Sequence, residues 1–352
     1  GRSLGACSGG GAAGCGRGRA GPGVEAERIF INVGGRPSSR GVQGADTTPH
    51  YTSSSIMDVD FVPEHLVVVG GSYIGLEFGQ MYRRFGSRVT VVEMGPRLIA
   101  REDEDVSAEV QAILEREGID VRLNATCLAL GRSARGVMLS VQCGDGAPQV
   151  EGSHVLLAVG RIPNTGDLGL ERAGVETDAR GYILVNDALE TSVPGIWALG
   201  DCNGRGAFTH TAYNDYEIVA DNLLDGATRR VTDRITAYAL FIDPPLGRVG
   251  MTLAEATKAG RKVLVGKRPM TRVGRAVEKG ETQGFMKVMV DAASKEILGA
   301  AILGVGGDEV VHTILQNMYA RQPYTTLRNA MHIHPTVSEL VPTLLGELEP
   351  TD

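Results

Sequence analysis

The sequence predicts an α/β fold in which a βαβ domain is inserted into a second domain and an α+β domain follows. Three observations carry this prediction. A β-branched run at 66–69 meets glycine at Gly70, and a helical pattern starts at once. Two similar motifs, an apolar strand followed by glycine, arginine and proline, stand at 28–37 and 155–163 on either side of this unit. From about residue 235 onward, strand and helix patterns alternate.

Composition limits the classes of function. A length of 352 residues predicts two to three domains with ample core. The formal net charge of −7 argues against a nucleic-acid or anionic-membrane partner. No apolar run reaches the roughly 18 residues of a membrane span. We therefore expect no nucleic acid and no membrane among the partners.

The five cysteines show neither C-x-x-C nor another metal or disulfide spacing. Reduced thiols, a cytoplasmic location and no metal site are the expectation. The cysteines are Cys7, Cys15, Cys127, Cys143 and Cys202. Residues 1–23 are of low complexity with almost no large apolar residue, which predicts disorder, and they lack the apolar core of a secretory signal.

The sequence at 70–77 is Gly-Gly-Ser-Tyr-Ile-Gly-Leu-Glu, which spans the turn from a predicted parallel strand into a predicted helix. The N-terminus of such a helix receives a phosphate. A second strand, 88–92, ends at Glu93, about 20 residues after the glycines, where a carboxylate can bind both hydroxyls of an adenosine ribose. A dinucleotide is the predicted ligand, and an ordinary βαβ turn that binds nothing is the alternative. Ser72 replaces an expected glycine and fits if its φ stays negative.

The remaining elements follow in order. A helix over 103–117 has acids in its first turn and ends at Gly118. A buried strand at the end of 191–201 delivers Asp201, and a helix over 211–224 follows it. Further strands are predicted at 121–123, 125–130, 137–142, 237–242, 284–290 and 297–303, and further helices at 253–259 and 308–320.

Three motifs in a fixed order, at 70–77, 191–201 and 334–339, resemble those of the class I pyridine nucleotide-disulfide oxidoreductases. This is the family of glutathione reductase, dihydrolipoamide dehydrogenase and mercuric reductase. The run at 243–250 also resembles the opening of the family's interface domain. The resemblance implies a Rossmann-like NAD(P)-binding domain inserted in a partial FAD-binding domain, followed by an α+β interface (dimerisation) domain. The implied bounds are 24–60 and 161–232 for the FAD-binding domain, 61–160 for the NAD(P)-binding domain and 233–352 for the interface domain.

The resemblance implies a set of cofactor-binding residues. Gly70, Ser72 and Gly75 match the nicotinamide-dinucleotide loop. Glu93 matches the acid that favours NADH over NADPH, because its carboxylate repels a 2′-phosphate. Arg97 leaves the alternative open, since its guanidinium could turn to that phosphate.

The resemblance extends to residues near the nicotinamide and the flavin. Tyr73 matches a ring that gates the nicotinamide pocket, and Glu77 matches an acid that pairs with a lysine beside the flavin. Both could instead be ordinary first-turn residues. Asp201 matches the acid that holds the ribityl chain of FAD. His210 matches the helix start under the flavin ring, with a helix-cap neighbour as its alternative. Gly160, in the second of the two similar motifs, is assigned to the cofactor site as well.

His334 and Glu339 match the family's base and the carboxylate that orients it. In the family this histidine serves the partner subunit, so a homodimer is implied. The implied reaction passes hydride from NAD(P)H to FAD and on to a disulfide or other small-molecule acceptor. No stretch of the sequence matches the family's first flavin-binding βαβ unit or its C-x-x-x-x-C pair, so we expect a truncated form. The alternative is a non-enzymatic nucleotide-binding and dimerisation module.

Overall fold

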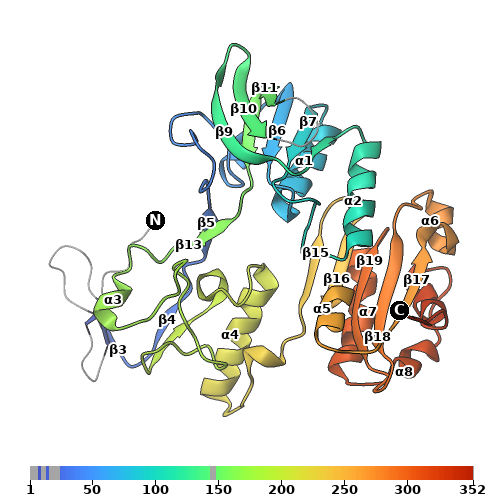
Figure 1. Ribbon diagram of the computed structural model, residues 1–352. Helices are drawn as coiled ribbons and strands as arrows, with labels where there is room; N and C mark the ends of the chain where they lie inside the picture. The colour runs from blue at the N-terminus through green and yellow to red at the C-terminus, as the bar shows by residue number, and fades with distance from the viewer. Residues whose placement is uncertain (1–6, 9–12, 16–23, 143–147, 352) are drawn as a thin grey trace. The chain divides into compact units, whose positions relative to one another are not determined.

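The computed structural model describes residues 7–8, 13–15, 24–142 and 148–351 (Figure 1). It divides into two compact units. Unit 1 comprises Gly1–Ser38 and Gly160–Arg234, and unit 2 comprises Ser39–Val159 and Ile235–Asp352. The chain leaves unit 1 after the first of the two similar sequence motifs and returns to it within the second. The predicted α/β fold class is confirmed.

The first half of unit 2 is built on a parallel sheet with the strand order β12-β6-β7-β8. Helix α1 (Tyr73–Arg84) follows β6, and helix α2 (Glu104–Arg116) follows β7. The strands are β6 (His65–Val69), β7 (Arg88–Val92), β8 (Asp120–Arg122) and β12 (His154–Leu157). The β-branched side chains of β6, β7 and β12 are buried, as expected for parallel strands covered on both faces, whereas Val121 of the edge strand β8 is only partly buried.

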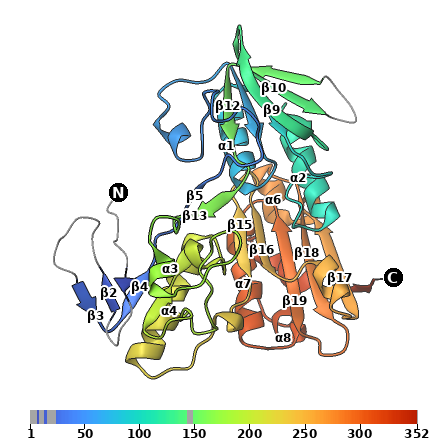
Figure 2. The same ribbon diagram turned by 60° about the vertical axis from the view of Figure 1, so that its left-hand side comes forward.

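An antiparallel sheet of order β11-β10-β9 stands beside this parallel sheet, and Figure 2 shows its hairpin. The strands are β9 (Thr126–Ser133), β10 (Gly136–Gln142) and β11 (Gln149–Gly152). The sequence predicted the first two. The third was not predicted, because it is short and Val150 is the one large apolar residue among its four.

Residues 39–60 differ from the predicted domain bounds. The sequence assigned them to the FAD-binding domain, whereas contacts place them in unit 2. The amide of Tyr51 donates to the carbonyl oxygen of Val155 at 2.8 Å, and Ile56, in η1 (Ser55–Asp58), is buried in the core of the parallel sheet. These long-range contacts leave no local signal in the sequence.

The second half of unit 2 is an antiparallel sheet of order β15-β16-β19-β18-β17-β20. Helix α7 (Gly307–Tyr319) packs against β16 and β19, where its apolar face covers Val249, Ala300 and Ile302. The strands are β15 (Ala237–Leu240), β16 (Leu246–Gly250), β17 (Val263–Pro269), β18 (Phe285–Asp291), β19 (Ile297–Leu303) and β20 (Glu349–Pro350). The smaller helices are α5 (Leu253–Lys258), α6 (Gly274–Lys279), α8 (Tyr324–Arg328) and α9 (Val341–Leu344).

The two halves of unit 2 share one hydrophobic core. Leu240, Leu246 and Leu303 of the antiparallel sheet belong to the same buried cluster as Leu76 of α1 and Val106 of α2. Because side chains alternate along a strand, one sheet face packs on α7 and the other faces the parallel-sheet half. This second face therefore carries the residues that join the halves.

In unit 1 the two similar sequence motifs pair with each other. Strand β4 (Ile29–Ile31) lies parallel to β14 (Ile196–Ala198), and β5 (Gly35–Pro37) lies antiparallel to β13 (Arg161–Pro163). Helix α4 (Thr209–Leu224) follows the short helix η2 (Gly200–Asn203), and α3 (Leu170–Ala173) precedes both. Within the described ranges, β4 has β14 as its only strand neighbour.

The expectation of disorder over residues 1–23 falls mostly outside the described residues. The described part differs from it: β1 (Cys7–Ser8) pairs with β2 (Ala13–Cys15), which pairs with β3 (Val24–Ala26). Backbone hydrogen bonds between short strands require no large apolar side chains.

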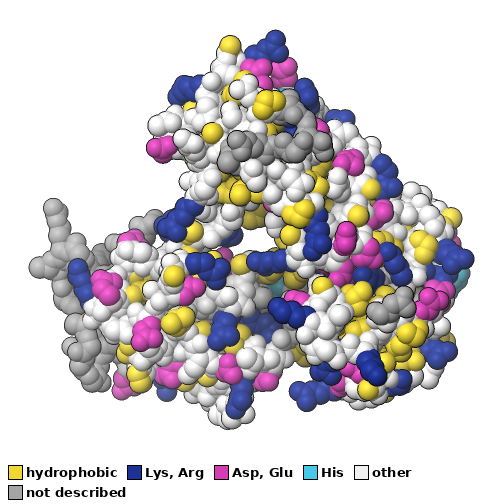
Figure 3. All heavy atoms as spheres, viewed as in Figure 1, with side chains coloured by type: hydrophobic (Ala, Val, Ile, Leu, Met, Phe, Trp, Pro, Cys, Tyr) yellow, Lys and Arg dark blue, Asp and Glu magenta, His cyan; other side chains and the backbone are white. Residues whose placement is uncertain are grey.

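None of the helices in the described ranges has the length and apolar character needed to span a membrane. Figure 3 shows acidic and basic side chains interspersed over the surface of each unit.

Candidate functional site

The glycine loop between β6 and α1 has the close packing that the motif predicts. Gly70 has φ +114°, a conformation that favours glycine. A Cβ on Gly75 would lie 2.0 Å from the carbonyl oxygen of Gly70, and one on Gly71 would lie 2.5 Å from Leu98 Cδ2. At Gly75 the Cβ would meet backbone, so glycine is required there and lets the first turn of α1 lie against the strand. At Gly71 the side chain of Leu98 would have to shift.

Ser72 is the N-cap of α1 and is exposed. Its φ of −107° is negative, as the sequence argument required. Its side chain makes no capping hydrogen bond to the helix. The backbone N–H groups of the first turn therefore lack a capping side chain, which suits a helix N-terminus that receives an anion.

Glu93 follows β7 and contacts the glycine loop directly. Its Oε2 accepts a hydrogen bond from the amide of Gly71 at 2.6 Å, and its Oε1 accepts one from the amide of Gly95 at 2.7 Å. Each carboxylate oxygen can accept a second bond, so the group retains acceptors for ribose hydroxyls. Arg97 donates to the carbonyl oxygen of Ala100 at 3.1 Å, which leaves its alternative role open.

Tyr73 is the first residue of α1. Its hydroxyl donates to Glu102 Oε1 at 3.2 Å, and its ring meets the ring of Tyr238 edge-on, with centroids 5.4 Å apart. Burial, followed by the nearby Glu102 carboxylate, raises the pKa of Tyr73 far above its ordinary value. The phenol is therefore a donor at all physiological pH values.

Glu77 lies one turn further along α1. Its Oε1 accepts a hydrogen bond from the amide of Phe241 at 2.9 Å. Burial raises the pKa of Glu77, and the bond from Phe241 only partly offsets this. Within the described residues the structure gives this acid a backbone partner rather than the lysine that the resemblance implied.

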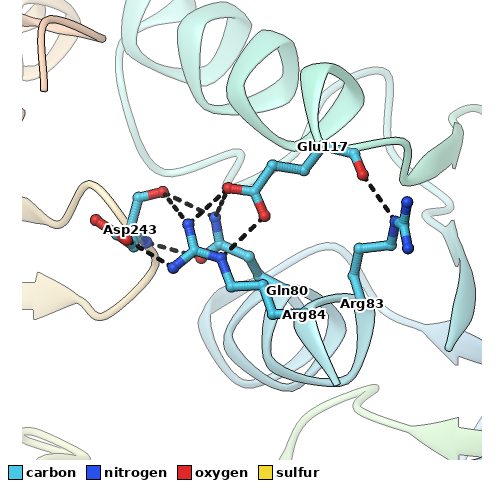
Figure 4. A network of polar contacts seen from close by, with 5 residues as sticks. All are labelled: Gln80, Arg83, Arg84, Glu117 and Asp243. Atoms are coloured by element: carbon cyan, nitrogen blue, oxygen red, sulfur yellow. Dashed lines mark hydrogen bonds and ion pairs between the residues drawn. The ribbon is translucent and has the colours of Figure 1, made fainter. Parts of the chain in front are cut away.

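The C-terminal end of α1 is held by a polar network (Figure 4). Arg84 donates to both carboxylate oxygens of Glu117, at 2.7 and 3.0 Å, and to Asp243 Oδ2 at 2.6 Å. Gln80 donates to Glu117 and exchanges two hydrogen bonds with the backbone of Asp243. Arg83 donates to the carbonyl oxygen of Glu117 at 2.7 Å. The C-terminal part of α1 is thus bonded to Glu117 after α2 and to Asp243, which lies between β15 and β16.

The acids around the start of α2 pair with bases on the antiparallel sheet. Lys287 Nζ lies 3.1 Å from Asp103 and 2.9 Å from Asp105, and Lys267 Nζ lies 2.7 Å from Asp105. Asp103 also accepts from the first amides of α5 and makes no capping bond to α2. The prediction that these acids serve the dipole of their own helix is therefore incomplete, because the buried Lys287 requires partners of opposite charge.

Asp201, His210 and Gly160 all lie in unit 1. Asp201 is in η2 after β14, and its Oδ2 is 3.6 Å from the guanidinium of Arg161. His210 is exposed in the first turn of α4, with its ring stacked on Phe208 at 5.2 Å. Gly160 has φ +119°, and its carbonyl oxygen accepts from the amide of Ser38 at 2.9 Å. These three residues thus belong to unit 1, whereas the glycine loop belongs to unit 2.

His334 and Glu339 form the pair that their motif predicts. His334 Nδ1 lies 2.8 Å from Glu339 Oε2, and the imidazole is 78% exposed. A carboxylate acceptor requires the proton on Nδ1, which leaves the lone pair on Nε2. Glu339 is itself fixed, because its amide donates to Thr336 Oγ1 at 3.2 Å. The arrangement can take up a proton at Nε2.

Sequence reasoning missed the residues that connect the two halves of unit 2. Glu102 is 2% exposed and Arg248 is 1% exposed. Lys287 occupies the middle of β18, in which every residue is buried. A signal was present, since each base interrupts an apolar strand and the acids stand in one short run at 102–105. Their partners, however, lie far away in the sequence.

Comparisons with known proteins agree with this fold. Residues 15–215 match the model of the pyridine nucleotide-disulphide oxidoreductases, and residues 236–345 match the dimerisation domain of the same family. The probable pyridine nucleotide-disulfide oxidoreductase RclA of Escherichia coli is 36% identical over 318 residues, which are 90% of this chain and 71% of that protein. Mercuric reductase of Streptomyces lividans is 34% identical over 90% of this chain and 66% of its own length.

A third relative is dihydrolipoyl dehydrogenase of Thermus scotoductus, 35% identical over 79% of this chain and 60% of its own length. The solved structure of the HOCl-induced flavoprotein disulfide reductase RclA from Escherichia coli matches with a TM-score of 0.87 and 34% identity, over 95% of this chain and 76% of that one. The chain spans about two thirds of the length of the curated relatives that it matches. It belongs to the pyridine nucleotide-disulfide oxidoreductase family.

Proposed function

We propose that this chain binds a nicotinamide dinucleotide at the glycine loop of unit 2 and serves an FAD-dependent NAD(P)H oxidoreductase of the disulfide-reductase type. The observation that carries the proposal is the loop itself. Glycine is required at Gly70 and Gly75, and the Glu93 carboxylate is bonded to the amide of Gly71 at 2.6 Å. The N-terminus of α1 would hold the pyrophosphate, and Glu93 would hold the adenosine ribose.

NADH is the proposed dinucleotide. The 2′-phosphate of NADPH would bring negative charge against the Glu93 carboxylate, which the backbone amides of Gly71 and Gly95 hold in place. Tyr73, beside the loop, would contact the nicotinamide half. The family resemblance suggests these roles, and the contact of Glu93 with the amide of Gly71 supports that of Glu93.

The residues of unit 1 fit part of a flavin site. Asp201 is half-buried at the carboxyl end of β14, the edge where ligands of α/β sheets bind, and α4 begins just after it. A Cβ on Gly35 would lie 3.6 Å from Asp201 Oδ2, an ordinary van der Waals contact, so the backbone of β5 lies beside this carboxylate. Asp201 would hold the ribityl chain, and His210 and Gly160 would lie at the margin of the site. A bound flavin would supply the two-electron chemistry between nicotinamide and acceptor.

His334 is the proposed base. Its Nε2 would take a proton from a thiol of the reduced acceptor or active site, while Glu339 keeps the proton on Nδ1. The match to a dimerisation domain over 236–345 supports a homodimer. A disulfide or other small molecule is the proposed acceptor. The absence of a disulfide spacing among the cysteines supports a cytoplasmic location.

Calorimetric titration with NADH and with NADPH tests the dinucleotide site. We expect wild-type protein to bind NADH at least about tenfold more tightly, a difference of about 1.4 kcal/mol, and Glu93→Ala to lose this preference. Glu115→Ala, an exposed acid on α2, is the matched control. Failure of the wild type to bind either dinucleotide would overturn the proposed site. Unchanged discrimination in Glu93→Ala would remove only the role of Glu93.

The visible absorbance of the purified protein separates the enzyme from the alternative function. Bound flavin, together with loss of dithiol-dependent activity in His334→Gln, would support the oxidoreductase. The second candidate is a nucleotide-binding and dimerisation module without redox activity, which the glycine loop and the match to a dimerisation domain would equally support. A protein that binds NADH but takes up no added FAD would support this second function.

A further inference from the structure

A buried polar cluster lies behind the first turn of α1. Glu102 Oε1 accepts hydrogen bonds from two phenols, from Tyr238 at 2.7 Å and from Tyr73 at 3.2 Å. Its other oxygen, Oε2, lies 3.7 Å from Arg248 Nε. We refer to these four residues as the Glu102 cluster. Tyr73 and Glu102 come from the parallel-sheet half of unit 2, and Tyr238 and Arg248 come from strands β15 and β16 of the dimerisation domain.

One side of the cluster is a buried ion pair without hydrogen bonds. Arg248 is 1% exposed, and among the described residues its three guanidinium nitrogens have no hydrogen-bond partner, nor does Glu102 Oε2. A buried charged group without hydrogen bonds is costly, so the carboxylate is drawn towards the guanidinium. The hydrogen bonds that Tyr73 and Tyr238 donate to Oε1 oppose this movement of the carboxylate. A small rotation of the carboxylate towards Arg248 would lengthen the bonds to the tyrosines.

The segment that carries Glu102 also supports the dinucleotide loop. The amide of Ile99 donates to the carbonyl oxygen of Gly71 at 2.8 Å, and the amide of Glu102 donates to the carbonyl oxygen of Ile99 at 2.8 Å. Ile99 is 2% exposed and has φ +38°, a conformation that β-branched residues rarely adopt. Strain of this kind persists only where the surroundings impose it, and it concentrates at functional sites. The loop and the cluster are therefore parts of one rigid arrangement.

From these contacts we infer that Glu102, which the hydrogen bond from Tyr238 holds against the attraction of Arg248, is a positioning residue that fixes Tyr73 beside the dinucleotide loop. The sheet of the dimerisation domain then helps to set the affinity for the nicotinamide half of the dinucleotide. Tyr73 would contact that half, whereas Glu93 holds the adenosine half. The inference rests on the proposed dinucleotide site and adds residues from a second domain to it.

Tyr238→Phe is the variant that tests this inference, because it removes one hydroxyl and keeps the ring. Without that donor, Glu102 can turn to Arg248 and release Tyr73. We expect the dissociation constant for NADH to rise about tenfold, the lower end of the effect of one hydrogen bond to a charged group. The dissociation constant for 5′-AMP, which occupies only the adenosine half, is expected to stay within about twofold.

Tyr82→Phe is the matched control. Tyr82 lies on the same helix, is 4% exposed, and donates through its hydroxyl to the carbonyl oxygen of Ile56 at 3.2 Å. It is remote from the loop along α1, so its loss should leave both dissociation constants unchanged. Equal weakening in the Tyr82 and Tyr238 variants would indicate a general effect of a buried hydroxyl and would overturn the inference.

A double replacement tests the route through Tyr73. In a Tyr73→Phe background, Tyr238→Phe should have no further effect on NADH binding, because the bond from Tyr73 to Glu102 is already absent. Independent, additive effects would refute positioning through Glu102. If wild-type protein binds NADH and Tyr238→Phe binds it equally well, the inference fails and the proposed site stands. If wild-type protein binds neither NADH, NADPH nor 5′-AMP, the proposed site itself fails.

Discussion

Replacing Lys287 by methionine should strongly destabilise unit 2, whereas the same change at Lys267 should not. Both lysines pair with Asp105, at 2.9 and 2.7 Å. The side chain of Lys287 is 5% exposed, and that of Lys267 is 44% exposed. The pair of variants therefore tests whether burial decides the contribution of an ion pair to one shared acid.

The expected magnitudes follow from this difference in burial. Removing one partner of a buried ion pair costs about 3–5 kcal/mol, because the remaining charge is left unpaired. Asp103 retains two backbone amides and Asp105 retains Lys267, so we expect about 3 kcal/mol for Lys287→Met. Lys267 also lies 3.9 Å above the ring of Phe285. An exposed pair with such a contact is worth about 1 kcal/mol, which we expect for Lys267→Met.

Urea denaturation followed by far-ultraviolet circular dichroism measures both changes. The midpoint should fall without a change in the slope with urea concentration. Adding Asp103→Asn to Lys287→Met should recover about 1–2 kcal/mol, because the amide removes the unpaired charge and still accepts from α5. Equal effects of Lys287→Met and Lys267→Met would refute the reasoning, as would wild-type stability of Lys287→Met.

The pH dependence gives a second check on the same cluster. Burial pushes the pKa of Asp105 up, but hydrogen bonds from Lys267 and Lys287 outweigh it and hold the pKa below the ordinary 3.8. A carboxyl whose folded pKa is depressed contributes stability above its unfolded pKa and loses it as pH falls through the folded value. The difference in stability between wild type and Lys287→Met should therefore shrink below pH 3.8. A constant difference would show that Asp105 is not the partner that matters.

Three further predictions concern other parts of the chain. Gly75→Ala should weaken NADH binding at least about tenfold in calorimetry, because the new Cβ would lie 2.0 Å from the carbonyl oxygen of Gly70, whereas Gly274→Ala, with open space around it, should bind normally. Glu77→Gln should match the wild type below pH 4.5 and exceed its stability in urea at pH 7, because burial raises the pKa of Glu77 and so penalises the ionised form. Asp215→Asn should lower the free energy of unfolding of unit 1 by about 3 kcal/mol, because the buried carboxylate accepts a hydrogen bond from the amide of Gly200 and pairs with Arg234. The fluorescence of the single tryptophan, which lies in the same unit, measures this change.

The local parts of the candidate site were predictable from the sequence. The glycine loop, the acid after the second strand and the histidine–glutamate pair each depend on residues close together in the chain. Short spacing fixes their geometry, since a strand that ends in glycines and feeds a helix has few conformations. The pairing of His334 with Glu339 at 2.8 Å needs only one short helical turn between them.

The pairing of the two similar motifs in unit 1 was only partly predictable. Their resemblance indicated two equivalent exits from an inserted domain. It did not indicate that the exits form one two-stranded ladder, in which Arg161 donates to the carbonyl oxygen of Gly35 at 2.6 Å and Arg36 donates to that of Pro163 at 3.1 Å. A repeat identifies similar environments, but strand partners depend on the path of the chain between them.

The junction between the halves of unit 2 was not predicted, although its charges were visible. Acids in the first turn of a helix interact favourably with the helix dipole, and a lysine in a strand usually marks an exposed edge strand. Each charged residue could therefore be explained by its own helix or strand, without a distant partner. An exposed edge strand does not fit Lys287, however, because this lysine interrupts a strand that is otherwise apolar at every position but its last. A charge at the centre of such a strand must be buried, and a buried charge requires a partner of opposite sign. The acidic run at 102–105 pairs with Arg248, Lys267 and Lys287, and these ion pairs add to the shared hydrophobic core in joining the parallel-sheet half of unit 2 to the dimerisation domain.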